Sequence, residues 1–209
     1  MSDALFSNLK SMISEDSKIL VAGLGNAGVT ADSLGPKVVE NLYITRHLKK
    51  EGMIKEAREL SAIAPGVMAQ TGIETSEILE ALVEKTKPDV MIAIDALAAR
   101  SSKRLNRTIQ ISDTGIAPGS GVGNHRNEIT RHTVGIPVLA IGVPTVISVP
   151  AIINDLLEEE EQETAYKKLD KEFISMHVTP KNIDESIRRI SYTISEGINQ
   201  LLHIRENRE

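Results

Sequence analysis

The sequence predicts a three-layer α/β/α domain built on a mostly parallel sheet. Short apolar runs bounded by glycine or proline alternate along the chain with segments that carry apolar residues at helical spacing. Several runs are apolar at successive positions, which is typical of strands buried on both faces, as in parallel sheets. The 209 residues, 41% of them hydrophobic, suffice for one sizeable core, and we expect a single domain over 1–209.

Strands and helices alternate through the first half of the chain. The apolar runs that predict strands lie at 18–23, 59–63 and 89–95. The segments whose apolar spacing predicts helices lie at 2–13, 34–50 and 75–86. Asp32 or Ser33 is placed to cap the helix that starts at 34, and Lys87-Pro88 ends the one that starts at 75. This alternation is typical of a parallel sheet with helical crossovers.

The second half adds two strands, at 108–112 and 138–142. The glycine-dense segment 115–124 joins them, so we expect it to lie over one edge or end of the sheet. Residues 155–172 include four consecutive glutamates and no useful apolar stripe. They predict a solvated helix or a mobile surface excursion.

A closing helix is expected over 180–203, with isoleucines along one face from Ile183 to Ile198. This stripe is wide enough to bury against the sheet or against another subunit. Together with the helix over 2–13, it offers more apolar face than one small sheet needs. We therefore expect the chain to self-associate.

Composition excludes several classes of function. With 24 Lys and Arg against 29 Asp and Glu, the net charge is −5, and no basic block is long enough to follow a nucleic-acid backbone. The absence of cysteine excludes disulfides, thiolate zinc sites, iron–sulfur clusters and a cysteine nucleophile. The start of the chain lacks the features of a signal peptide, and no apolar stretch approaches the ~18 residues of a membrane span. We expect a cytoplasmic protein without a membrane partner.

The segment 23–28 matches G-x-G-x-x-G directly after the first predicted strand, a pattern used to bind dinucleotide pyrophosphates. Two features count against a dinucleotide. The following helix is expected near Ser33 and not at the third glycine, and no acidic residue ends a second strand at the expected ~20-residue spacing. The glycines are better explained as a tight turn, and we expect no cofactor.

Asp32 and Asp95 form the sharpest pair of candidate residues. In a parallel sheet of strand order 2-1-3, the loop after the first strand and the end of the third strand meet at the carboxyl edge. Asp32 lies in that loop and Asp95 at that strand end. Two carboxylates there would hold one proton between them, so that one acts as base on water while the other donates to a carbonyl. The competing interpretation is that Asp32 only caps a helix and Asp95 only ends a strand.

Other chemistries find less support. The five histidines form no H-E-x-x-H pattern, and we expect no metal site. His125, which follows the glycine-dense segment, is the one histidine that could join the two aspartates as a metal ligand. Ser120 lies between glycines but lacks the strand–turn–helix frame of a serine nucleophile.

Long segments of the chain resemble the germination protease family of endospore-forming bacteria. The segments lie in order and are spread over most of 19–203, which makes the resemblance specific. They are VAGLGN (21–26), VTADSLGP (29–36), TRHL (45–48), GVMAQTGIET (66–75), AIDALAAR (93–100), QISDTG (110–115), PGSGVGN (118–124), GVPTV (142–146) and VTPK (178–181).

The resemblance implies an endopeptidase that opens small acid-soluble spore proteins during germination, in the forespore or spore core. It also implies a homotetramer, a zymogen with an N-terminal propeptide, and a fold similar to the hydrogenase-maturation endopeptidases. The family's proposed catalytic aspartates match Asp32 and Asp95. We expect substrate binding at residues within the matching segments, namely Asn26, Gly119, Ser120, Gly121 and Asn124.

Two alternatives stay open beside this function. Only 18 residues precede Ile19, fewer than the family's N-terminal region, and the segment around 150–175 is shorter than and unlike the family's. The chain could therefore be a truncated, non-catalytic relative that binds spore proteins. The other alternative is a metal-assisted endopeptidase of the maturation type that uses Asp32, Asp95 and His125.

Overall fold

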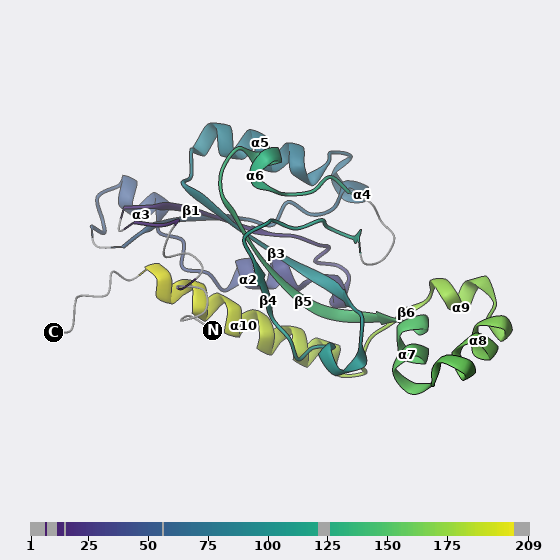
Figure 1. Cartoon of the computed structure of the whole chain (residues 1–209). Helices are drawn as coiled ribbons and strands as arrows, with labels where there is room; N and C mark the ends of the chain where they lie inside the picture. Colours follow the sequence, from purple (N-terminus) through teal and green to yellow (C-terminus); the bar gives the residue numbers. More distant parts are fainter. Residues whose placement is uncertain (1–6, 8–11, 15, 56, 121–125, 203–209) are drawn as a thin grey trace.

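The structure is a computed structural model of the chain, shown in Figure 1. It describes residue 7 and residues 12–14, 16–55, 57–120 and 126–202. Most of the helix predicted over 2–13 lies outside the described residues. Among the described helices, none combines the length and apolar character that would let it cross a membrane.

A six-stranded, mostly parallel sheet forms the centre of the molecule, in the order β2-β1-β3-β5-β4, with β6 also paired to β5. The strands are β1 (Lys18–Gly23), β2 (Glu59–Ile63), β3 (Val90–Ala99), β4 (Gln110–Ser112), β5 (Val138–Ser148) and β6 (His177–Val178). The pairs β1/β2, β1/β3 and β3/β5 are parallel, whereas β4 and β6 run antiparallel to β5. The neighbouring positions of β1 and β3 confirm the predicted 2-1-3 order.

Both faces of the sheet are covered, which explains why its strands are apolar at successive positions. Ile19 and Val21 of β1 pack into one apolar cluster, with α2 (Leu34–Glu40) and α10 (Ile183–Leu202). Leu20 and Ala22 pack into the other cluster, with α5 (Thr75–Thr86) and α6 (Arg131–Val134). Figure 1 shows α10 and α5 on opposite sides of the sheet. The predicted three layers are therefore present.

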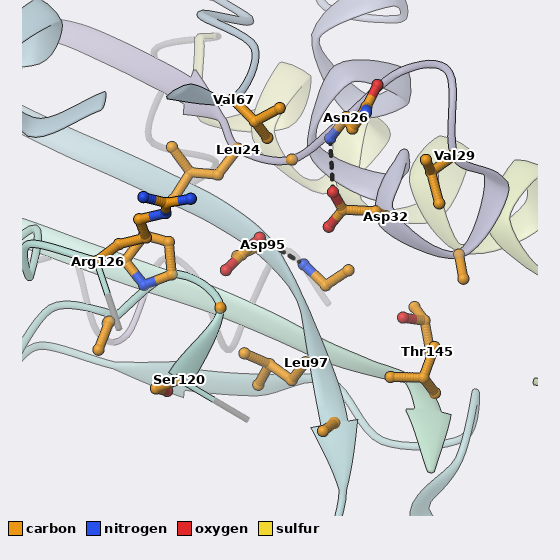
Figure 2. A pocket seen from close by; sticks show the side chains of 18 of the residues that line it. Leu24, Asn26, Val29, Asp32, Val67, Asp95, Leu97, Ser120, Arg126 and Thr145 are labelled. Carbon is orange, nitrogen blue, oxygen red and sulfur yellow. Dashed lines mark hydrogen bonds between the residues drawn. The ribbon is translucent and has the colours of Figure 1, made fainter. Parts of the chain in front are cut away.

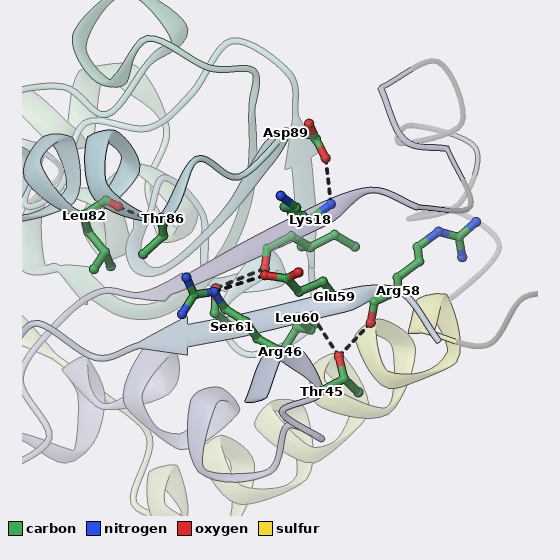
Figure 3. A network of polar contacts seen from close by, with 11 residues as sticks. Lys18, Thr45, Arg46, Arg58, Glu59, Leu60, Ser61, Leu82, Thr86 and Asp89 are labelled. Atoms are coloured by element: carbon green, nitrogen blue, oxygen red, sulfur yellow. Dashed lines mark hydrogen bonds and ion pairs between the residues drawn. The ribbon is translucent and has the colours of Figure 1, made fainter. Parts of the chain in front are cut away.

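The helix predicted over 34–50 is wrong as one element. The chain forms α2, then an irregular segment, then α3 (Arg46–Lys50). Asn199 of α10 accepts a hydrogen bond from the Tyr43 backbone N–H and donates one to the Asn41 carbonyl. The Thr45 hydroxyl donates to the Arg58 carbonyl and accepts from the Leu60 N–H (Figure 3). These long-range bonds satisfy the backbone between the two helices and replace a continuous helix.

Strands β3 and β5 extend beyond the predicted 89–95 and 138–142. Their pairing continues from Asp95 opposite Gly142 to Ala99 opposite Ile147. The register shifts between Leu97 and Ala98, where β5 accommodates one extra residue next to Pro144. Proline is tolerated in a sheet at such a bulge. The two strands therefore form a ribbon that projects past the end of β1.

The isoleucine stripe of α10 belongs to the core of this chain. Ile187, Ile194 and Ile198 are buried, and α10 packs on α2 and the sheet. Burial against the sheet confirms one of the two expected uses of the stripe. These isoleucines are therefore occupied within the chain, and the expected self-association stays a proposal.

Three helices follow β5 and project from the sheet (Figure 1). They are α7 (Val149–Leu156), α8 (Glu159–Lys168) and α9 (Lys171–Ser175). Helix α8 buries none of its residues, which confirms the solvated helix predicted within 155–172. Leu156 and Phe173, on the neighbouring helices, are exposed apolar side chains.

Candidate active site

A cavity of about 710 Å³ lies at the carboxyl ends of the parallel strands, where α/β proteins commonly bind their ligands. Asn26 and Asp32 line it from the segment after β1, and Val67 lines it from the segment after β2. Asp95 of β3 and Thr145 of β5 complete these walls (Figure 2). The loop after β1 therefore meets Asp95 as the 2-1-3 order predicts, but Asp95 does not end its strand as expected, because pairing with β5 continues β3 to Ala99.

Asp95 is almost completely buried, with 2% of its surface exposed. Its Oδ1 accepts a hydrogen bond of 2.9 Å from the backbone N–H of Ala96, whereas its buried Oδ2 has no partner among the described residues. Burial first, and the charge of Asp32 second, raise the pKa of Asp95 to about 8. This shift favours the protonated form of Asp95 at neutral pH, the form that can donate a proton.

Asp32 is the last residue of a short 3-10 helix, η1 (Thr30–Asp32), and its side chain points toward Asp95 (Figure 2). Its Oδ2 accepts a hydrogen bond of 2.8 Å from the backbone N–H of Asn26. Burial raises the pKa of Asp32, and the bond from Asn26 acts against that shift by stabilising the carboxylate. Asp32 is only partly buried, so it holds a negative charge more readily than Asp95.

The loop after β1 reaches Asp32 only because it contains glycine. Gly25 has φ +104°, and a Cβ built there would lie 2.1 Å from the Asp32 carbonyl oxygen. A Cβ at Gly23 would lie 2.3 Å from the Gly35 carbonyl oxygen, at the start of α2. Two glycines of the G-x-G-x-x-G match thus allow close packing of this loop on η1 and α2. That packing fits the tight turn expected from the sequence.

Asn26 links three parts of the site. Its backbone N–H binds Asp32, and its side-chain Oδ1 accepts from the Gly28 N–H and from Nε2 of Gln70, each at 2.9 Å. Gln70 belongs to a short helix, α4 (Met68–Thr71), at the far wall of the cavity. Asn26 therefore positions Asp32, and the contact with substrate predicted for it stays a proposal.

The glycine-dense segment 115–124 is described up to residue 120, and this part of it reaches the cavity. Gly119 and Ser120 line the cavity, which agrees with their expected place near the sheet end. Gly121, Asn124 and His125 lie outside the described residues. Within the described ranges, no group of three or more histidine, aspartate and glutamate side chains could hold a metal ion.

Arg126, which no sequence motif predicted, also lines the cavity (Figure 2). Its Nη1 lies 3.6 Å from Oε1 of Glu74 and 3.5 Å from the sulfur of Met68. Arg126 thus brings a positive charge to the wall formed by the segments after β2. A single arginine in an irregular segment forms no motif, so only the fold could reveal this placement.

Comparison with known proteins identifies the family. The family model described as germination protease matches residues 2–158. The chain belongs to the germination protease family. The germination protease of Caldanaerobacter subterraneus subsp. tengcongensis is 47% identical over 218 residues, which cover 91% of this chain and 67% of that relative. The germination protease of Geobacillus sp. (strain WCH70) is 60% identical over 149 residues, covering 70% of this chain and 40% of that relative.

Family membership confirms the resemblance carried by the sequence segments. The chain spans two fifths to about two thirds of the length of these germination proteases. Asp32 and Asp95, the candidate pair, both lie inside the part of the chain that the germination protease model matches.

Solved structures that are similar to this chain include two hydrogenase maturation proteases. The [NiFe] hydrogenase maturation protease HycI from Thermococcus kodakarensis KOD1 is 18% identical, covers 91% of this chain and 98% of its own, and has a TM-score of 0.45. The hydrogenase 2 maturation peptidase from Thaumarchaeota archaeon SCGC_AB-539-E09 is 13% identical, covers 88% and 99%, and has a TM-score of 0.40. Neither likeness bears on the chemistry of the site.

Proposed function

We propose that this chain is an endopeptidase that cleaves small acid-soluble spore proteins during germination, with Asp32 and Asp95 activating water. Membership of the germination protease family supports the reaction class and the setting. The observation that carries the mechanism is that a buried Asp95, whose pKa is raised to about 8, and a more exposed Asp32 line one cavity. Two carboxyl groups with separated proton affinities are typical of acid–base catalysis.

Each aspartate has a distinct part in the proposed reaction. Ionised Asp32 accepts a proton from water as the water oxygen attacks the scissile carbonyl carbon. Asp95 donates its proton to the carbonyl oxygen, which gives a neutral tetrahedral intermediate. When the C–N bond breaks, Asp32 delivers its proton to the leaving nitrogen and the new carboxyl group returns a proton to Asp95. Water is consumed, and both aspartates regain their starting states.

The different environments of Asp95 and Asp32 indicate which aspartate is the acid and which is the base. Asp95 is the more buried group, and burial disfavours its charged form. Asp32 receives a backbone hydrogen bond from Asn26, which favours its charged form. The proton shared by the pair therefore resides mainly on Asp95, and Asp32 is left as the base.

The experiment is incubation of the purified chain with a small acid-soluble spore protein, with and without a chelator, and mass spectrometry of the products. We expect cleavage at discrete bonds, equal in both arms, because two carboxylates are fewer than the three protein ligands zinc usually takes. An Asp95→Asn variant is the control for contaminating proteases. Intact substrate would contradict the proposed endopeptidase activity and favour the alternative that the chain is a non-catalytic relative that binds spore proteins. Activity lost to the chelator and restored by a divalent ion would favour the metal-assisted alternative.

We also propose that the chain assembles as a homotetramer and acts in the forespore or spore core. The exposed apolar side chains of the projecting region support an interface there, because such surface favours association. They are Leu156, Phe173, Ile174, Met176 and Val178. Sedimentation equilibrium at micromolar concentration should give the mass of four chains, and a monomer would contradict the proposal.

A further inference from the structure

The edge of β3 that faces β1 extends past the end of β1. The last register pair between them is Gly23 with Ile94, and the Leu24 N–H then donates to the Ile94 carbonyl at 2.8 Å. At Gly25 the chain turns toward Asp32, with φ +104°. Strand β3 continues to Ala99 and keeps only β5 as a neighbour among the described strands. Residues 96–99 therefore form a short open edge directly after Asp95.

The backbone direction along β3 is fixed at two points. The Ile94 carbonyl faces β1, since it accepts from Leu24, whereas the Met91 N–H faces β5, since it donates to the Pro137 carbonyl. Successive residues of a strand direct their N–H and C=O groups to alternate sides. Ala96 and Ala98 consequently present their backbone groups on the side of Ile94, toward the open edge.

The open edge has a defined set of donors and acceptors. The Ala96 N–H is already bound by Oδ1 of Asp95. Within the described part of the chain, the Ala96 carbonyl and both backbone groups of Ala98 have no hydrogen-bond partner on this side. One donor and two acceptors thus face the cavity in the spacing of a sheet ladder.

The surroundings of the edge suit an extended chain. Residues 96–99 line the same cavity as Asp32 and Asp95. Val29 and Asp32 form the opposite wall (Figure 2). Alanine side chains project little, so a second backbone has space to approach the edge, and they offer no polar group of their own. Recognition at this place therefore rests on the main chain.

We propose that the polypeptide substrate binds this edge as an added β-strand, by main-chain hydrogen bonds to Ala96 and Ala98. The inference rests on the proposed endopeptidase function. Strand addition to an exposed sheet edge is a known mode of peptide recognition, in which main-chain bonds give affinity. Because the edge begins at the residue after Asp95, the added strand brings one of its peptide groups beside the aspartate pair. Residues 96–99 thus act as positioning residues for the scissile bond.

Strand addition requires backbone N–H groups at alternate residues of the substrate. Alternate residues of the added strand direct their N–H groups to β3, and the residues between direct theirs away. Methylating a backbone nitrogen that faces β3 removes a donor and places a methyl group against the edge. Methylating a nitrogen that faces away does neither. A contact made through side chains would show no such alternation.

The test is an N-methyl scan on the unmodified chain. Peptides spanning a bond that the chain cuts in a small acid-soluble spore protein are synthesised with one N-methylated residue each, and kcat/KM is measured for every peptide. On one side of the scissile bond we expect losses of about tenfold or more at alternate positions, with the intervening positions within about threefold of the parent peptide. Uniform losses, or none, would overturn the inference.

A variant of the chain tests the hydrogen bond that the Ala98 N–H is proposed to donate to the substrate. Ala98→Pro removes the proposed donor while the N–H faces away from β5, so no ladder bond to β5 is lost. We expect kcat/KM to fall about tenfold or more, chiefly through KM. Ala98→Ser keeps the N–H and is the matched comparison, so we expect its kcat/KM to lie well above that of Ala98→Pro. If Ala98→Pro fails to fold, the N-methyl scan alone still tests strand addition.

The outcomes separate the inference from the function on which it rests. Cleavage of the unmethylated peptide without alternation in the scan contradicts strand addition alone. No cleavage of that peptide contradicts the proposed function and the inference with it. If Ala98→Pro cleaves normally but no longer self-associates, the edge pairs with a second copy of the chain, and the inference is overturned.

Discussion

A Cβ at Gly25 would lie 2.1 Å from the carbonyl oxygen of Asp32 and 3.0 Å from its Oδ1, so this glycine sets how closely the loop after β1 approaches the candidate base. The same loop supplies the Asn26 N–H that binds Asp32. The position of one half of the aspartate pair therefore depends on the absence of a side chain at a neighbouring residue.

Gly25→Ala is expected to disable the site. The added methyl group forces Asp32 or the loop to move, and φ +104° strains any residue with a Cβ. A displacement of this kind can cost about 100-fold in rate, which we expect in kcat/KM for spore-protein cleavage.

Gly52→Ala is the matched control for that change. Gly52 also has a positive φ, +73°, but nothing lies within 4 Å of a Cβ built there. It therefore carries the same kind of backbone strain without touching the site. If Gly52→Ala loses as much activity as Gly25→Ala, backbone strain explains the effect and the close approach to Asp32 does not.

The pH dependence of cleavage should be bell-shaped. Activity requires Asp95 protonated and Asp32 ionised. As the pH rises through about 8, Asp95 loses its proton and kcat/KM falls. As the pH falls, Asp32 becomes protonated, at a pKa raised above its ordinary value of 3.8. The profile of kcat/KM from pH 4 to 10 measures both limbs, and a rate that keeps rising above pH 9 would contradict the assignment of Asp95 as the acid.

Asp95→Asn should stabilise the fold at alkaline pH. The pKa of Asp95 is higher in the folded chain than the ordinary 3.8, so the folded state binds the proton more tightly than the unfolded state. The stability linked to that proton is fully present below the ordinary value and is lost as the pH rises toward 8. Asparagine carries no charge to bury. The melting temperature of the Asp95→Asn variant at pH 9 should therefore exceed that of the parent by about 3 °C or more.

The same comparison at low pH provides the internal control. Near pH 4 Asp95 is protonated in the folded chain, and the two melting curves should converge. Asp155 is a second control, because hydrogen bonds from Ser102 lower the pKa of this exposed carboxyl. Asp155→Asn should not raise the melting temperature at pH 9. Equal stabilisation by both changes would show that loss of net negative charge, and not burial of Asp95, is responsible.

The sequence predicted the topology and the aspartate pair for the same reason. Strands buried on both faces are apolar at successive positions, as in Ile19 and Leu20 of β1, so five of the six strands and the 2-1-3 order of the first three could be recognised. Once β1 and β3 were neighbours, the loop that holds Asp32 had to leave β1 next to Asp95, because the last pair between the two strands is Gly23 with Ile94. Local pattern and chain topology sufficed for this much of the site.

What the sequence did not indicate depends on distant contacts. The interruption between α2 and α3 rests on Asn199, which binds Asn41 and Tyr43 from more than 150 positions away. The extension of β3 to Ala99 is alanine-rich and has little strand propensity of its own, so only its pairing with β5 forms it. Arg126 likewise reaches the cavity through the packing of its segment against α4.

In the proposed mechanism Asp32 and Asp95 act as one unit. The most direct measurement is kcat/KM for cleavage of a small acid-soluble spore protein by Asp32→Asn, Asp95→Asn and the double variant, with melting temperatures to verify the fold. We predict that each single change abolishes cleavage and leaves the chain folded, and that the double change costs little more than either one, because residues that act as a unit are not additive. A folded Asp95→Asn chain that cleaves at near the parent rate would contradict the mechanism.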